Sequence, residues 1–148
     1  MFHVEPARLS DVDFVLANMS EITAHELDLI GRSAAEYKDY ITRNFLAAET
    51  LYDDDRPAFV IGYEIHETLL FTWFLATDAF FRSHRSIAFG RDYMRRVKCR
   101  FPSRAIFSLS ALQGEKTERW FNLMGARLVY TCPPVPGMTA EKLSLYQF

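Results

Sequence analysis

Apolar residues recur along the chain at two spacings, one typical of helices and one of strands. Steps of three and four residues predict helices, because positions at that spacing share one helix face. The predicted helices are Ser10–Met19, Ala24–Ile30, Ser33–Phe45, Ile87–Phe101 and Thr117–Met124. Ser33 has the side chain to cap the third helix, Pro102 ends the fourth, and Gly125 stands where a left-handed cap would end the last.

Shorter apolar runs bounded by turn residues predict strands. The expected strands are Phe2–Arg8, Leu51–Tyr52, Ala58–Ile65, Leu69–Ala76, Ala105–Leu109, Ala126–Tyr130 and Lys142–Gln147. Leu69–Ala76 is apolar on both alternating faces, which is typical of a central strand covered on both sides. Thr77–Arg85, between this strand and the longest helix, is expected to be a loop. The order of the elements predicts one α/β domain over residues 1–148.

Composition narrows the class of protein. The chain is 49% hydrophobic and 24% charged, which suits a globular domain. Its longest nearly apolar run, Leu69–Ala76, is far too short to cross a bilayer, and the first six residues lack the features of a signal peptide. Cys99 and Cys132 define neither a disulfide framework nor a zinc-binding spacing. We therefore expect a cytoplasmic protein with reduced thiols and no membrane contact.

Charge is divided unevenly along the chain. Met1–Phe81 holds five Lys/Arg and fifteen Asp/Glu, whereas Arg82–Phe148 holds twelve and four. Eight of those twelve cations lie between Arg82 and Arg104. This pattern favours an anionic ligand for the second half, and a solvated cationic helix face is the alternative. Nucleic acid fits less well, because the first half is acidic and no DNA- or RNA-reading motif is present.

The segment that follows Leu69–Ala76 has the chemistry to bind phosphate. A strand there runs into a helix start, where unpaired N–H groups and a partial positive charge suit an anion. Charge-assisted hydrogen bonds from side chains contribute about 1.5–3 kcal/mol each, against about 0.3–1 kcal/mol for the helix end. The side chains available are Arg82, Ser83, Arg85 and Ser86. The alternative is that a serine caps the helix and the arginines face water.

Residues 69–130 resemble the GNAT (Gcn5-related N-acetyltransferase) superfamily. The resemblance rests on the element order and on the pairs Trp73-Phe74 and Thr77-Asp78, Arg82 with the basic helix after it, Arg119-Trp120-Phe121 and Gly125-Ala126. It implies an α/β fold with a mixed central sheet of about six to seven strands and helices on both faces. Within the superfamily the chain most resembles small GNAT-like proteins of short-tailed phages, which include internal virion proteins and host-modifying proteins.

That resemblance implies an acyl-CoA site. In the superfamily the pantetheine arm lies between two diverging strands, which here are Leu69–Ala76 and Ala105–Leu109. Carried over by position, the cofactor-binding residues are Phe74, Leu75, Ala76, Arg82, Ser83, Arg85 and Ser86. Arg85 and Ile87 stand where the superfamily has small residues. Small residues let a phosphate approach the main-chain N–H groups closely, so the departure weakens the match at this loop.

The catalytic positions match the superfamily less well. Phe121 occupies the position of a frequent tyrosine acid and cannot donate a proton, and Leu69–Ala76 holds no carboxylate. Glu64, with His66 beside it, is the candidate base, and Ser110 and Tyr130 are candidate proton donors to the leaving thiolate. The alternative for each is an ordinary polar residue. Two functions follow: an acetyl-CoA-dependent N-acyltransferase acting on a host protein amine, or a non-catalytic GNAT-fold virion component or host-binding module.

Overall fold

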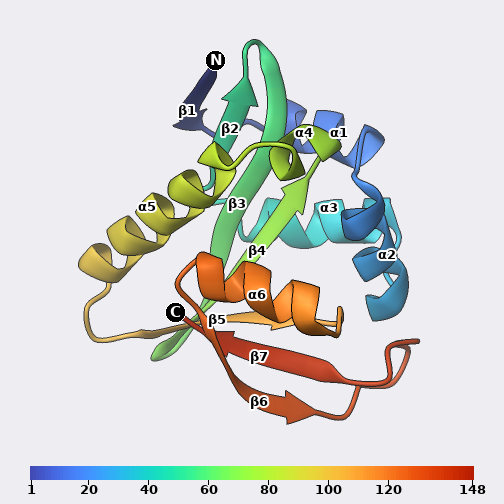
Figure 1. Cartoon of the computed structure of the whole chain (residues 1–148). Coiled ribbons are helices and arrows are strands. Elements are labelled where there is room, and N and C mark those ends of the chain that lie inside the picture. Colours follow the sequence, from blue (N-terminus) through green and yellow to red (C-terminus); the bar gives the residue numbers. More distant parts are fainter.

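One mixed sheet of seven strands runs through the molecule, with helices on both faces (Figure 1). The computed structural model describes all 148 residues. In spatial order the strands are β1-β2-β3-β4-β5-β7-β6. Their bounds are β1 Phe2–Pro6, β2 Glu49–Asp53, β3 Arg56–His66, β4 Leu69–Ala76, β5 Ala105–Ser110, β6 Arg127–Cys132 and β7 Leu143–Gln147. The predicted α/β class, strand number and two-sided helix cover are confirmed.

The sheet has two halves joined by a single parallel pair. Strands β1 to β4 form an antiparallel meander, and β7 pairs antiparallel with both β5 and β6. Strand β4 runs parallel to β5, so a crossover must connect them, and the helical segment between them supplies it. The pairing of β4 with β5 covers only three positions, from Leu69 opposite Ala105 to Phe71 opposite Phe107. Beyond Phe71 the two strands diverge.

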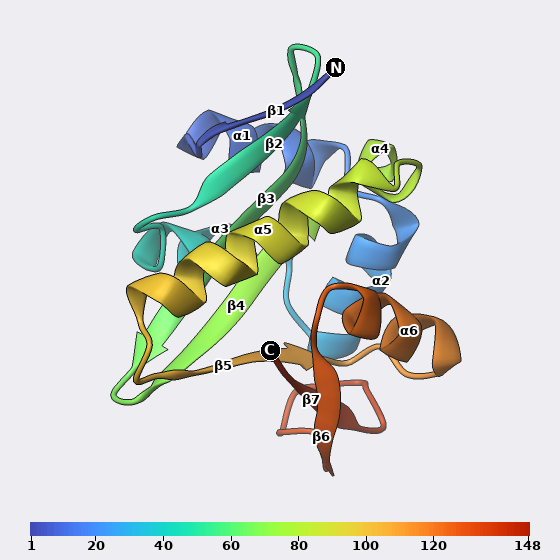
Figure 2. The same ribbon diagram turned by 60° about the vertical axis from the view of Figure 1, so that its left-hand side comes forward.

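Six helices pack around this sheet. They are α1 Leu9–Ala17, α2 Glu21–Ile30, α3 Ala34–Arg43, α4 Asp78–Phe81, α5 Arg85–Arg100 and α6 Glu115–Leu123. Helix α5 crosses one face of the meander, and α1 and α3 cover the other (Figures 1 and 2). The α5 side of the core includes Phe59, Leu70 and Tyr93, whereas the opposite side includes Val60 and Trp73. None of the helices combines the length and apolar content needed to cross a bilayer.

Local signals in the sequence account for most element ends. The Ser33 hydroxyl accepts a hydrogen bond from the Glu36 N–H at 3.1 Å, which caps α3 as predicted. Gly31 and Gly125 follow α2 and α6 with φ of 70° and 96°, a backbone region that glycine adopts without strain. Strand β4 has the bounds predicted from its two apolar faces. These elements form where neighbouring residues alone set the conformation.

The connection Thr77–Arg85 differs from the prediction, because it contains the short helix α4 rather than a loop alone. Phe80 is buried and stacks on Phe59 with ring centroids 4.0 Å apart. The Thr77 N–H and hydroxyl both donate to the Ala58 carbonyl, at 2.9 and 3.1 Å. Both contacts tie the segment to β3. A sequence pattern of four residues could not reveal this packing.

Candidate functional site

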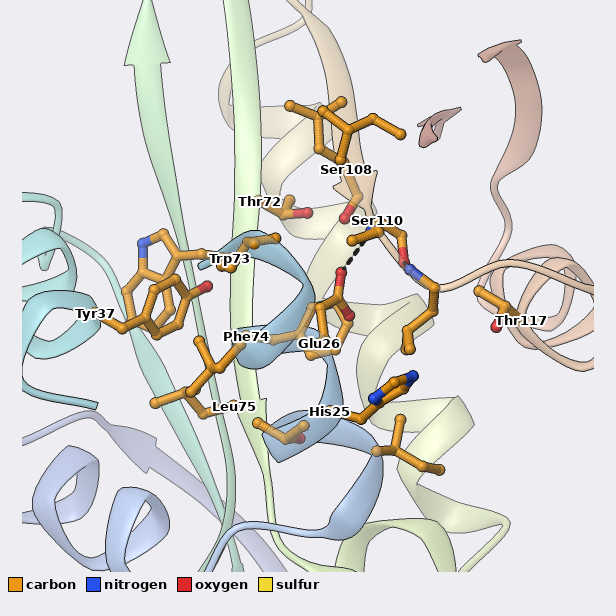
Figure 3. Close-up of a pocket in the computed structure, with 18 of the residues that line it drawn as sticks. His25, Glu26, Tyr37, Thr72, Trp73, Phe74, Leu75, Ser108, Ser110 and Thr117 are labelled. Atoms are coloured by element: carbon orange, nitrogen blue, oxygen red, sulfur yellow. Dashed lines mark hydrogen bonds between the residues drawn. The ribbon is translucent and has the colours of Figure 1, made fainter. Parts of the chain in front are cut away.

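A cleft of about 950 Å³ opens where β4 and β5 diverge. Its walls come from β4, β5, the end of β3, and helices α2, α3 and α6. Figure 3 shows Phe74 and Leu75 on one side of the cleft, and Ser108 and Ser110 on the other. The volume lies within the range of small-molecule and cofactor sites. The cleft occupies the gap between these two strands that the resemblance to the GNAT superfamily implied.

The edge of β4 offers main-chain hydrogen-bonding groups to this cleft. The Ala76 carbonyl, at the end of β4, accepts a hydrogen bond from the Ser20 N–H at 2.9 Å on the edge away from β3. Main-chain groups alternate between the two edges of a strand. The N–H and C=O of Phe74 therefore point to the same edge, beyond the last residue that pairs with β5. A ligand in the cleft can bond to Phe74 as an added strand would.

The carboxylate of Glu26 lies inside the cleft (Figure 3). Helix α2 carries it, and Ser20 caps that helix by accepting the Thr23 N–H at 3.1 Å. One oxygen of Glu26 accepts the Ala111 N–H at 3.0 Å, just beyond β5. Burial raises the pKa of Glu26, and hydrogen bonds from Ala111 and Ser110 oppose that rise. A half-buried carboxyl with a raised pKa, in a cleft, has the properties of a general base.

Glu26 is not among the site residues predicted from the sequence, although the sequence holds a signal for it. Within α2 the residue shares a helix face with Ile22 and Ile30, at spacings of four. An acid in an apolar stripe is unusual, since it must be solvated or hydrogen-bonded where it is buried. That signal predicts a buried carboxylate but not its partner, because Ala111 lies on a distant segment.

The predicted base Glu64 also lines the cleft, at the end of β3. Both of its carboxylate oxygens have partners. The Tyr40 hydroxyl donates a hydrogen bond to Oε2 at 2.6 Å, and the His66 Nε2 lies 2.6 Å from Oε1. Burial and Glu64 together raise the pKa of Tyr40 well above its usual value, so this phenol stays protonated. The Arg32 guanidinium lies over the Tyr40 ring, 5.1 Å from its centroid. Glu64 thus anchors a hydrogen-bonded cluster in the cleft wall.

Aromatic side chains line the same wall. Tyr37 stacks on Tyr40 with ring centroids 5.6 Å apart. Trp73 donates its indole N–H to the Asn44 carbonyl at 3.1 Å and lies over Gly62, where a side chain would meet the indole ring. These contacts hold Trp73 against the sheet and give the cleft a rigid apolar surface.

The beginning of α5 differs from the predicted phosphate cradle. Most main-chain N–H groups there already donate within the segment. The pairs are Arg82 to the Asp78 carbonyl, Ser83 to the Phe80 carbonyl, Arg85 to the Ser83 hydroxyl, Ser86 to the Ser83 carbonyl and Ile87 to the His84 carbonyl. The Ser86 hydroxyl is buried and donates to the Phe80 carbonyl at 2.7 Å. These N–H groups are already hydrogen-bonded because α4 folds the segment into consecutive tight turns.

Arg82, Ser83, Arg85 and Ser86 do not line the cleft. The Arg82 side chain is 78% exposed and lies 3.9 Å from Asp78. Further along the helix, Arg95 pairs with Asp92, and Arg96 pairs with both Asp92 and Glu49. Part of the cationic stretch is therefore neutralised by acids of the same protein, and Arg82 and Arg85 remain as exposed cations at its start.

The remaining predicted residues are divided between the cleft and the surface. Ser110 is buried in the cleft beside Ala111. Tyr130 is 62% exposed on β6, outside the cleft, because β6 is an edge strand separated from β5 by β7. Ala76 is buried and its carbonyl is bonded to Ser20. Phe121 is buried and stacks on Tyr146, with centroids 3.9 Å apart. The molecule has no cluster of side chains that could hold a metal ion.

Comparisons with known proteins agree with this architecture. Neither the protein-family models nor the curated proteins give a match to the sequence. Solved structures of similar fold include a GNAT-family acetyltransferase from Bacillus anthracis, at a TM-score of 0.70 and 11% identity over 99% of this chain and 93% of that one. A GNAT-family acetyltransferase from Streptococcus pneumoniae is also similar, at a TM-score of 0.65 and 6% identity over 100% of this chain and 98% of that one.

A third similar structure, from Salmonella typhimurium, was solved with its cofactor acetyl-CoA. It has a TM-score of 0.66 and 11% identity over 99% of this chain and 92% of that one. Identities this low establish shared architecture and leave the chemistry to the site itself. The diverging strands, the crossover helix and these alignments agree on one conclusion: this chain has the fold of the GNAT acetyltransferases.

Proposed function

We propose that this protein is an acyl-CoA-dependent N-acyltransferase and that its acceptor amine enters the β4–β5 cleft beside Glu26. The observation that carries the proposal is the half-buried Glu26 carboxylate, held by Ala111 in the cleft between the diverging strands. A base there lies in the cleft that β4 and β5 also line. The fold supports the same activity, since its solved neighbours include acetyltransferases.

Acetyl-CoA is the proposed acyl donor, as in the similar structure solved with that cofactor. When bound, it supplies an activated acetyl group and departs as a thiol. The N–H and C=O of Phe74 would bond to its amide groups, and the cleft has room for its arm. At the diphosphate, Arg82 and Arg85 would act through their side chains, because the N–H groups of that segment are largely committed.

Three protein groups are candidates to move protons: one base and two donors. Glu26, in its ionised form, would take the proton that the acceptor amine must lose. Ser110 accepts the Leu112 N–H at 3.2 Å and donates its hydroxyl proton to Glu26, so it would have to turn from Glu26 to protonate the leaving thiolate. Tyr37, which also lines the cleft, is a second donor, and burial raises its pKa so that it stays protonated. A thiol has an ordinary pKa of about 8.5, so its thiolate is a good leaving group and needs only a weak acid for protonation.

The charge of the cleft supports a cationic acceptor. Glu21, Glu26 and Glu64 all contribute to its lining, against the cations Arg32 and Lys116. An amine that is protonated in solution would be attracted to these carboxylates. We further propose that the acceptor is a lysine or N-terminal amine of a host protein. The resemblance to host-modifying phage proteins supports this choice. The exposed residues Glu21 on α2 and Lys116 on α6 line the cleft, and an extended acceptor would enter past them.

Binding and turnover test this proposal separately. Acetyl-CoA should raise the melting temperature of the protein, because a ligand bound only by the folded state stabilises it. Release of free thiol should then depend on added amine, with peptide N-termini and lysine peptides compared with small amines. The absence of both stabilisation and calorimetric heat with acetyl-CoA would overturn the proposal. Stabilisation without thiol release would show that the wrong acceptor had been offered or that the chemistry is lost.

A non-catalytic binding module is the second candidate. The observation that favours it is the beginning of α5, where the N–H groups that could bind a diphosphate are already bonded. Phe121 in place of a proton-donating tyrosine agrees with it. Thiol release that is abolished by Glu26→Gln would remove this candidate. Failure to bind acetyl-CoA would favour it.

A further inference from the structure

Two buried tyrosine hydroxyls lie on the face of the sheet covered by α5, away from Glu64 and its cluster. Tyr63 on β3 is 4% exposed, and Tyr93 on α5 is 1% exposed. Neither hydroxyl has a hydrogen-bond partner within the protein. A buried phenol without a partner is costly, because it has lost its hydrogen bonds to water. Two such hydroxyls at one place therefore indicate a site where a ligand would supply the missing hydrogen bonds.

Both tyrosines line a second cavity, of about 240 Å³. It lies between β2, β3 and the C-terminal half of α5, the helix that crosses the sheet in Figure 2. None of its lining residues belongs to the larger cleft. Besides the tyrosines, its polar side chains are Glu49, Arg96 and Arg100. The site is thus separate from the proposed acyl-transfer cleft.

The charges around this cavity leave one free cation. Arg96 binds both oxygens of Glu49 at 2.7 Å, so these two residues neutralise one another. Arg100 has no carboxylate partner and lies over the Phe101 ring, 5.5 Å from its centroid. Burial raises the pKa of Tyr93, so its hydroxyl remains a hydrogen-bond donor at neutral pH. Two neutral donors and one cation match a ligand with a single negative charge and two acceptor oxygens.

We propose that this cavity binds a small monocarboxylate, with Tyr63 and Tyr93 donating hydrogen bonds to its oxygens and Arg100 balancing its charge. The cavity is large enough for such an anion and too small for the acyl donor of the proposed function. The site spans β3 and α5, so an occupied cavity would hold the helix to the sheet. The proposal does not depend on acyl transfer.

Thermal unfolding with sodium acetate, compared with sodium chloride at equal ionic strength, tests the proposal. Acetate should raise the melting temperature of the wild-type protein. Each hydrogen bond to a charged group is strong enough that Tyr63→Phe or Tyr93→Phe should weaken acetate binding about tenfold. The double variant should lose the acetate effect, and it should still fold because both rings remain. Arg100→Gln should weaken binding about tenfold as well.

Lys98→Gln removes an exposed cation from the same helix outside the cavity and serves as the control. It should leave the acetate effect unchanged. Amide chemical shifts on acetate addition should move around β3 and the C-terminal half of α5. No acetate effect beyond that of chloride, or an effect retained in the double tyrosine variant, would overturn the site. Stronger stabilisation by sulfate or phosphate than by acetate would overturn the choice of a monocarboxylate.

Discussion

Glu26 and Ala111 are 85 positions apart in the chain, yet the Glu26 carboxylate accepts the Ala111 N–H at 3.0 Å. The bond joins α2 to the segment that leaves β5, across the space between β4 and β5. It satisfies a main-chain N–H that has lost its place in the sheet, and it places a carboxylate in the cleft. One contact therefore supports both the shape of the cleft and its proposed chemistry.

Replacement of Glu26 by glutamine should slow acyl transfer strongly while the fold and acetyl-CoA binding remain. Glutamine keeps an oxygen for the Ala111 N–H but cannot accept a proton at neutral pH. Loss of a general base lowers rates by about 100-fold or more. The measurement is kcat for thiol release, together with the acetyl-CoA-induced rise in melting temperature. Glu36→Gln, at an exposed position of α3, is the matched control and should be fully active.

The raised pKa of Glu26 should also appear in the pH dependence of stability. Between its unfolded pKa, near 4.5, and its higher folded pKa, only the folded protein binds this proton. Raising the pH through that window should therefore lower the free energy of unfolding. Glu26→Gln lacks the titration, so its stability relative to wild type should increase with pH across the window. Denaturant unfolding at a series of pH values measures this difference, and a constant difference would contradict the assignment.

Gly62 and Gly90 should respond differently to alanine. A Cβ at Gly62 would meet the ring of Trp73, which is held by Asn44 and cannot retreat. Gly62→Ala should lower the free energy of unfolding by about 1–3 kcal/mol, as overpacking does. A Cβ at Gly90 would meet only the flexible end of Met124, and alanine favours the helix by about 1 kcal/mol. Denaturant unfolding should show a clearly smaller loss for Gly90→Ala, and equal losses would contradict this reading of the two contacts.

Arg82 and Arg85 should contribute to acetyl-CoA binding through charge. Arg82→Ala and Arg85→Ala should each raise the acetyl-CoA Kd by up to about tenfold, less than a buried ion pair would, because both side chains are exposed. Binding should weaken with added salt for the same reason. Calorimetry at two ionic strengths measures both effects. Arg91→Ala, an exposed cation further along α5, should bind as the wild type does, and equal weakening would indicate a general field rather than a diphosphate site.

The amino-acid sequence by itself determined the elements that depend on neighbouring residues. The two apolar faces of β4 marked it as the central strand, and Ser33 and Gly125 marked helix ends. These signals are local, because the period of apolar side chains and the cap residues act within a few positions. The same patterns indicated an α/β sheet with helices on both faces, which the structure confirms.

Only the tertiary structure decided which groups lie in the cleft and in what state. Tyr130 lies outside the cleft because the order of the strands places β7 between β5 and β6. The N–H groups at the start of α5 are committed because Phe80 is buried against Phe59 and turns the segment into α4. Burial and hydrogen bonding of Glu26 depend on residues far along the chain. Such properties arise from packing between distant segments, which no local pattern encodes.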